Sequence, residues 1–138
     1  MKPISFASVL CLQKKSTNQS AIRFQPKNLS NKSEKTSNFL VCSKCGTKIC
    51  SPDDEICIHG KHSWEKVNPA GVHYLIRCFA LAENCLAITP PTEDFSWFQG
   101  FAWSVIICSN CQSHLGWQFT GQTSSFFGMI ETAIQSSH

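Results

Sequence analysis

The sequence predicts a mainly β fold in one small domain, and three observations lead to this prediction. Two C-x-x-C pairs lie far apart in the chain, Cys42 with Cys45 and Cys108 with Cys111. Apolar residues alternate on both sides of the second pair, as they do along strands that bury one face. A chain of 138 residues has room for one hydrophobic core and no second one.

The four paired cysteines, Cys42, Cys45, Cys108 and Cys111, predict one structural Zn2+ site. A C-x-x-C turn presents two thiolates to one cation, and two such turns supply the four ligands of a closed tetrahedral site. Because residues 46–107 separate the pairs, the metal must join two distant hairpins. Four thiolates leave no open coordination position, so this zinc is not expected to be catalytic. Redox-active pairs or disulfides are the alternatives, but neither pair begins a helix in a βαβ pattern.

The other five cysteines form no such pairs. In a reducing compartment they are interpreted as inert buried thiols, whereas in a secreted protein some of them could form disulfides. We favour the first interpretation for this set, which comprises Cys11, Cys50, Cys57, Cys78 and Cys85.

Residues 1–38 differ in composition from the rest of the chain, because they carry seven Lys or Arg against Glu34 alone. They are predicted to be a disordered tail or a targeting segment, with a minimal signal peptide, a transit peptide and a plain flexible tail as the alternatives. We favour an intracellular location over secretion.

Residues 39–138 carry five basic against eight acidic residues, which does not suit a nucleic-acid partner. No segment reaches the roughly 18 apolar residues of a membrane span.

The flanks of the second cysteine pair predict a β-hairpin. A hairpin centred on Asn110 sets Trp103 opposite Trp117 and Val105 opposite Leu115, so that the two indoles face each other across the strands. A slip of one residue would move the two rings to opposite faces of the sheet.

A third tryptophan, Trp97, lies on a loop that Gly100 allows to turn tightly back toward the hairpin. Three indoles brought together would make a concave apolar site. Two kinds of guest suit such a site: a cation held by the ring faces, or a flat neutral ring with its polar edge bonded to backbone. Physics alone leaves both open, and on spacing alone Trp103, Trp117 and Phe119 are more simply ordinary core aromatics.

Several motifs follow one another along the chain. They are Cys42-x-x-Cys45, Val67-Asn-Pro69, Ser96-Trp-Phe-Gln-Gly-Phe-Ala-Trp103, Cys108-x-x-Cys111, Ser113-His-Leu-Gly-Trp117, Phe119 and Phe126-Phe-Gly-Met129. Together they resemble the signature of the cereblon-type thalidomide-binding domain and cover nearly all of residues 39–134. The resemblance implies a zinc-stapled β-tent of two antiparallel sheets with a short C-terminal helix, spanning residues 39–138.

The resemblance also implies a ligand site. In it the three tryptophans form the walls of a cage, Phe119 closes the floor, and the backbone of residues 95–97 bonds the edge of an imide. The implied ligand-binding residues are Asn68, Phe95, Ser96, Trp97, Trp103, Trp117 and Phe119. Two departures from the family pattern are Phe95, where human cereblon has His, and an Asn-Pro loop that is one residue shorter before His73. Because the implied contacts at Phe95 are mainly backbone ones, binding is expected to survive.

The implied function is recognition of cyclic imides: glutarimide or thalidomide-like compounds, or the cyclised C-terminal Asn or Gln of a degron. In cereblon, further regions connect this site to a ubiquitin ligase, and no adaptor site is visible in residues 1–38. We therefore expect a ligand-binding module related to ubiquitin-ligase substrate recognition. It is not expected to be an enzyme or to bind nucleic acid or membranes.

Two alternatives belong to other functional classes. A methionine sulfoxide reductase of the B type has a related fold and zinc pairs, but it needs a nucleophilic cysteine late in the chain, and none follows Cys111. Neither His73 nor His114 has a Ser or Cys motif beside it that would suggest a catalytic pair. The other alternative is a zinc-stapled protein-interaction module whose aromatics form only the core.

Deletion of residues 1–38 is expected to leave folding and ligand binding unchanged, because these residues cannot bury enough apolar surface to support the domain. Circular dichroism and ligand titration of the shortened chain test this boundary. An unfolded or non-binding product would show that the boundary is wrong.

Overall fold

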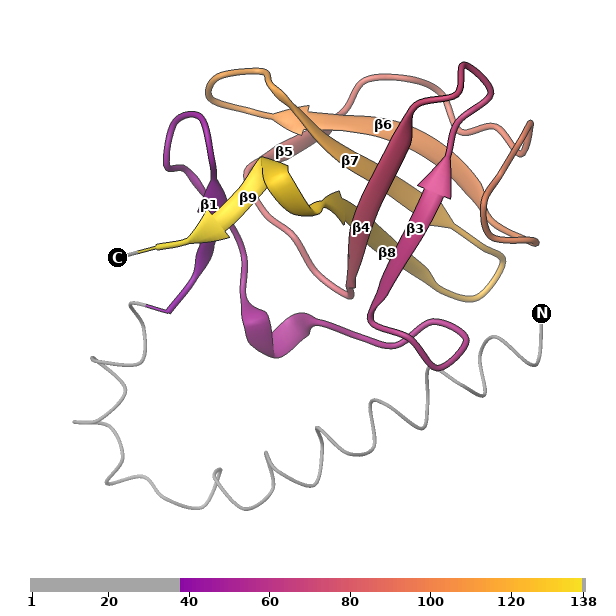
Figure 1. Cartoon of the computed structure of the whole chain (residues 1–138), viewed down its shortest axis with the longest axis horizontal. Helices are drawn as coiled ribbons and strands as arrows, with labels where there is room; N and C mark the ends of the chain where they lie inside the picture. The colour runs from indigo at the N-terminus through magenta and orange to yellow at the C-terminus, as the bar shows by residue number, and fades with distance from the viewer. Residues whose placement is uncertain (1–37, 138) are drawn as a thin grey trace, which may run out of the picture.

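A computed structural model describes residues 38–137, which form two antiparallel sheets (Figure 1). The smaller sheet has the order β2-β1-β9 and comprises β1 (Leu40–Cys42), β2 (Lys48–Cys50) and β9 (Ile134–Ser136). The larger sheet has the order β3-β4-β8-β7-β6-β5. Its strands are β3 (Ser63–Val67), β4 (His73–Phe79), β5 (Cys85–Ala87), β6 (Ala102–Cys108), β7 (His114–Thr120) and β8 (Ser125–Ile130).

The predicted mainly β fold with two antiparallel sheets is confirmed. The short C-terminal helix corresponds to a single 3-10 turn, Glu131–Ala133, between β8 and β9, and a second such turn, Pro52–Asp54, follows β2. The prediction of a tail or targeting segment concerns residues that, up to residue 37, lie outside the described part. Within the described residues, no helix has the length and apolar character needed to cross a membrane.

The larger sheet carries a hydrophobic cluster on each of its two faces. One cluster packs this sheet against the smaller one and includes Leu40, Ile49, Phe79, Leu115 and Met129. The other is covered by the loops before β3 and before β6, and it includes Ile58, Ile76, Phe98, Phe101, Trp117, Phe119 and Phe126. Strands such as β6 can serve both clusters because successive side chains point to opposite faces. The aromatic residues of the second cluster therefore lie on the face of the larger sheet that points away from the smaller sheet.

The hairpin of β6 and β7 forms, but its predicted register is wrong. Trp103 pairs with Phe119, and Val105 pairs with Trp117, so each partner is displaced by two residues from the expected one. One residue of this displacement arises in the turn, because Ile107 pairs with His114 and not with Ser113 as expected. The second arises at an irregularity next to the turn, where Ile106 pairs with Gly116. One extra residue, Leu115, is thus accommodated on β7 as a bulge. A displacement by two residues keeps the rings on one face, so Trp103 and Trp117 are diagonal neighbours instead of a direct pair.

Gly116 makes this bulge possible. Its φ of +156° belongs to a region that side chains rarely adopt, and a Cβ atom there would collide with the carbonyl oxygen of Gly128 on β8. Only a glycine lets the two backbones approach so closely.

Gly116→Ala is expected to lower the free energy of unfolding by about 2–5 kcal/mol, because backbone strain and overpacking add at one position. Gly60→Ala is the matched control, since Gly60 also has a positive φ, +82°, but open space around the position of a Cβ. The control should lose only about 1–2 kcal/mol. Urea unfolding followed by tryptophan fluorescence measures both variants, and equal losses would contradict the steric argument.

Candidate functional site

Four cysteines from two distant turns meet between the sheets. Cys42 and Cys45 lie at the β1–β2 turn, and Cys108 and Cys111 lie at the β6–β7 turn; the four sulfur atoms are all within 4.8 Å of one another. The closest pairs across the turns, Cys42 with Cys111 and Cys45 with Cys108, are 3.6 Å apart. A tetrahedral ion with metal–sulfur bonds of about 2.3 Å holds its sulfurs about 3.8 Å apart. The cluster therefore has the dimensions and the ligand type of a structural metal site.

The two cysteine turns share one backbone design. In the first, Gly46 N–H donates to Cys42 C=O over 2.8 Å, and in the second, Gln112 N–H donates to Cys108 C=O over 2.8 Å. The residue after each pair has a positive φ, +80° at Gly46 and +66° at Gln112. Glycine adopts this conformation without strain, whereas Gln112 adopts it at some energetic cost. The repeat shows that each turn is built to hold two sulfurs in the same geometry.

Hydroxyl groups support the sulfurs from equivalent positions. Thr47 Oγ1 lies 3.1 Å from Cys45 Sγ, and Ser113 Oγ lies 3.1 Å from Cys111 Sγ. Hydrogen bonds from Thr47 and then Asn110 lower the pKa of Cys45 to about 5. Burial raises the pKa of Cys42, but hydrogen bonds led by Ser113 outweigh this effect and the net direction is downward. Donors that stabilise thiolates are the outer shell expected around a metal held by sulfur.

Burial raises the pKa of Cys108 within the cluster. The same effect dominates for three thiols outside the cluster. Burial raises the pKa of Cys50 and of Cys78 to about 12, and it also raises the pKa of Cys85. Thiols that stay protonated are poor nucleophiles and poor ligands, which agrees with their interpretation as inert buried side chains. The same interpretation is wrong for Cys57, which is disulfide-bonded, as the alternative interpretation of these cysteines allowed. Cys11 lies outside the described residues.

Cys108→Ser is expected to abolish tight metal binding and to lower the thermal unfolding midpoint by at least about 10 °C, because metal affinity contributes directly to folding here. Cys85→Ser is the matched control: Cys85 pairs with Cys108 across β5 and β6 but does not belong to the cluster. Elemental analysis should find one metal ion per chain in the control and much less in Cys108→Ser. Purified, folded protein without any bound metal would refute the assignment.

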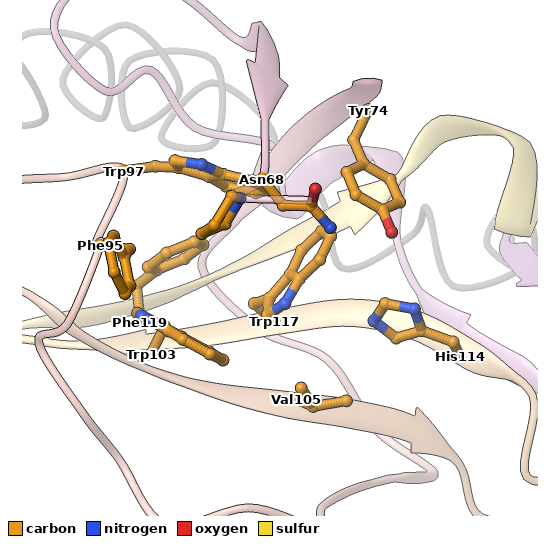
Figure 2. Close-up of a pocket in the computed structure, with 10 residues that line it drawn as sticks. Asn68, Tyr74, Phe95, Trp97, Trp103, Val105, His114, Trp117 and Phe119 are labelled. Carbon is orange, nitrogen blue, oxygen red and sulfur yellow. The ribbon is translucent and has the colours of Figure 1, made fainter. Parts of the chain in front are cut away.

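A pocket of about 360 Å3 opens on the aromatic face of the larger sheet (Figure 2). Its lining comes from the β3–β4 turn and β4, from the loop before β6, and from β6 and β7. The lining residues are Asn68, Pro69, Tyr74, Phe95, Trp97, Trp103, Val105, His114, Trp117 and Phe119. A volume of this size is at the lower end of the range typical of small-molecule sites, roughly 300–1,000 Å3.

Backbone carbonyls hold two of the indole walls in place. Trp97 Nε1 donates to Val67 C=O over 3.0 Å, and Trp103 Nε1 donates to Asp94 C=O over 2.7 Å. Trp97 also packs edge-on against Trp117, with ring centroids 4.8 Å apart. With the N–H edges of Trp97 and Trp103 bonded to backbone, these walls offer the cavity mainly apolar ring surface.

The loop before β6 carries Phe95 and Ser96, and it places them differently. Phe95 lines the pocket, but its side chain is 76% exposed and its φ is +58°, a conformation uncommon for a bulky residue. The Ser96 hydroxyl donates within the loop, to Phe101 C=O at 2.7 Å and Phe98 C=O at 3.0 Å, and Ser96 does not line the pocket. Ser96 therefore shapes the loop, while the other six residues predicted for the ligand site all border one cavity.

Tyr74 and His114 also line the pocket, although neither belongs to the predicted set of ligand-binding residues. His114 and Trp117 are three residues apart, which in a regular strand puts their side chains on opposite faces. The bulge at Leu115 restores both to one face, and their rings pack edge-on with centroids 4.9 Å apart. Burial lowers the pKa of His114, so the imidazole is neutral at pH 7. The sequence contained one indication that His114 belongs to the site, because His114 lies within the motif that includes Trp117.

Curated relatives of this sequence carry the name Protein cereblon. One from Xenopus tropicalis is 33% identical over 111 residues, covering 69% of this chain and 25% of that protein. One from Danio rerio is 32% identical over 104 residues, covering 69% and 24%, and one from Drosophila melanogaster is 26% identical over 110 residues, covering 73% and 19%. No family model matches the sequence. The chain thus spans about a quarter or less of the length of these relatives.

Two antiparallel sheets joined by a four-cysteine cluster suited to a metal ion define this chain as a small metal-binding β-tent module. The similarity to relatives from frog, fish and fly narrows the class further. The described residues form a cereblon-like domain, which confirms the resemblance inferred from the motifs.

Proposed function

We propose that residues 39–138 form a binding module for flat cyclic imides, with Trp97, Trp103 and Trp117 as the walls of the site and Phe119 as its floor. The observation that carries this proposal is one cavity of about 360 Å3 bordered by all four rings. The ligand classes are glutarimide or thalidomide-like compounds and the cyclised Asn or Gln at the end of a peptide chain. By its similarity to cereblon, the module would serve substrate recognition by a ubiquitin ligase.

The backbone of the loop before β6 supports the choice of an imide. Within the described residues, Phe95 N–H and Trp97 N–H donate no hydrogen bond, and Phe95 C=O accepts none. Ser96 N–H, in contrast, donates to Glu93 C=O. Two donors and one acceptor from adjacent residues complement the acceptor–donor–acceptor edge of an imide. A buried polar edge needs such partners, because each unpaired group would weaken binding.

The charge of the lining argues against a cationic guest. None of the ten lining residues is acidic, and the only titratable base among them, His114, is kept neutral by burial. A cation would thus be held by ring faces alone. A neutral ring needs no counter-ion, so the lining suits it better.

We assign Zn2+ as the ion of the cysteine cluster, because four thiolates in a tetrahedral arrangement are its usual structural ligand set. Its role would be to join the two sheets. The lining of the pocket includes no cysteine, so it offers no nucleophile of the kind that a B-type methionine sulfoxide reductase requires. Binding without catalysis is therefore the function that we propose, with a protein-interaction module as the remaining alternative.

Trp103→Ala and Trp117→Ala are expected to lower the affinity for glutarimide by at least about tenfold, or roughly 1.4 kcal/mol, because each removes one wall. Phe95→Ala should have a smaller effect, since the proposed contact is with its backbone. Trp64→Phe is the control: Trp64 is the one tryptophan that does not line the pocket. Calorimetric titration measures affinity, and elemental analysis should find unchanged metal in every variant.

A quaternary ammonium compound of similar size provides the decisive comparison. An imide site should reject it because it lacks a hydrogen-bonding edge, whereas a cation cage should prefer it. Tighter binding of the ammonium compound than of the imide would contradict the proposed ligand class. If the tryptophan variants and the unaltered protein bound both compounds equally, the rings would be core residues only.

A further inference from the structure

Lys66 does not line the pocket, but it lies next to the loop that carries Trp97. It belongs to β3, an edge strand of the larger sheet, and its side chain is partly buried. Lys66 Nζ donates to Trp97 C=O over 3.4 Å. The next residue of the strand, Val67, accepts a hydrogen bond from Trp97 Nε1 over 3.0 Å. Two adjacent residues of β3 thus hold one tryptophan, the first at its backbone and the second at its ring.

The peptide group between Trp97 and Phe98 is held from both sides. Its carbonyl accepts from Lys66 Nζ, and its N–H donates to Ser96 Oγ over 3.3 Å. A peptide group with partners on both sides has little freedom to rotate. Lys66 therefore restricts the backbone that directs the Trp97 ring toward the pocket.

Two ring faces hold the Lys66 ammonium beside this peptide group. Its Nζ lies 4.8 Å from the ring centroid of Trp64 and 5.0 Å from that of Phe98. Both distances are within the roughly 6 Å over which a cation and a ring face attract each other. Trp64 also packs edge-on against Phe98, which is only 2% exposed. Lys66 thus connects the edge strand, the core beneath the loop and the loop itself.

The position of Lys66 is unusual for a lysine, because it forms no ion pair with a carboxylate among residues 38–137. Burial lowers the pKa of Lys66, and the positive charge of Lys61 lowers it further. A lysine that extended into water would avoid this cost, so what the buried position provides is contact with the loop. Lys61 is the useful contrast. Its Nζ also lies over the Trp64 ring, at 4.4 Å, but its side chain is exposed, and no hydrogen bond or ring contact joins it to the loop in the described part of the chain.

We propose that Lys66 is a positioning residue of the imide site, which acts through Trp97 by keeping the loop before β6 in the conformation that the ligand meets. This inference rests on the proposed function and deepens it. Lys66 itself touches no ligand. Without its ammonium group the loop would populate other conformations, and the apparent affinity would fall with the fraction of molecules in the competent one.

The test compares Lys66→Met with Lys61→Met, because methionine keeps a flexible apolar stem but has no ammonium group. Both variants lose a cation above the Trp64 ring, and both should stay folded with unchanged metal content. Only Lys66→Met should bind glutarimide more weakly, by at least about fivefold in calorimetric titration, whereas Lys61→Met should change the affinity by less than about twofold. Lys66→Arg keeps a positive charge and N–H donors, so it should restore most of the affinity. Equal weakening in both methionine variants, or no recovery with arginine, would overturn the inference.

Amide hydrogen exchange of the ligand-free protein tests the same step without any ligand. The bond of Phe98 N–H to Ser96 Oγ depends on the orientation of the peptide group that Lys66 holds. Exchange at Phe98 should be at least about threefold faster in Lys66→Met and unchanged in Lys61→Met. Unchanged exchange in Lys66→Met would overturn the inference. Failure of the unaltered protein to bind glutarimide would overturn the proposed function alone, because exchange would still decide whether Lys66 positions the loop.

Discussion

The junction of two cysteine turns, one from each sheet, is the constraint on which the rest of the structure depends. Four sulfurs within 4.8 Å would repel one another as thiolates, and a metal ion at their centre would make the arrangement favourable. The turn that holds Cys108 and Cys111 leads, three residues later, into the bulge of β7. That bulge sets which side chains of β7 face the pocket. The metal cluster and the aromatic pocket are therefore two ends of one short hairpin.

The parts that the sequence could predict are those encoded by local pattern. Two C-x-x-C pairs need one shared ion to complete a tetrahedron, and this requirement alone brings Cys42 and Cys45 to Cys108 and Cys111. Alternating apolar residues around the second pair predict a hairpin, and β6 and β7 form it. Neither inference requires knowledge of which strands are neighbours in the sheet.

The parts that the sequence could not predict depend on residue count and strand order. The turn is one residue longer than expected, and Leu115 adds one more residue as a bulge. Together they convert the expected pairing of Trp103 with Trp117 into pairings with Phe119 and Val105, and nothing in the alternation reveals them. The same extra residue brings His114 to the face of Trp117. Tyr74 reaches the pocket from β4, which is separated from β7 by β8, and such non-consecutive neighbours leave no mark on local periodicity.

The hydrogen bonds of Trp97 to Val67 and of Trp103 to Asp94 would affect how tightly the pocket binds a ligand. Both indoles are anchored to backbone without any ligand, so their rotamer freedom is lost when the chain folds and not when a guest arrives. A rigid receptor of this kind keeps more of its contact energy as affinity. In the proposed binding function, such a receptor would also discriminate by shape, because walls that do not adjust penalise a ring that is puckered or too wide.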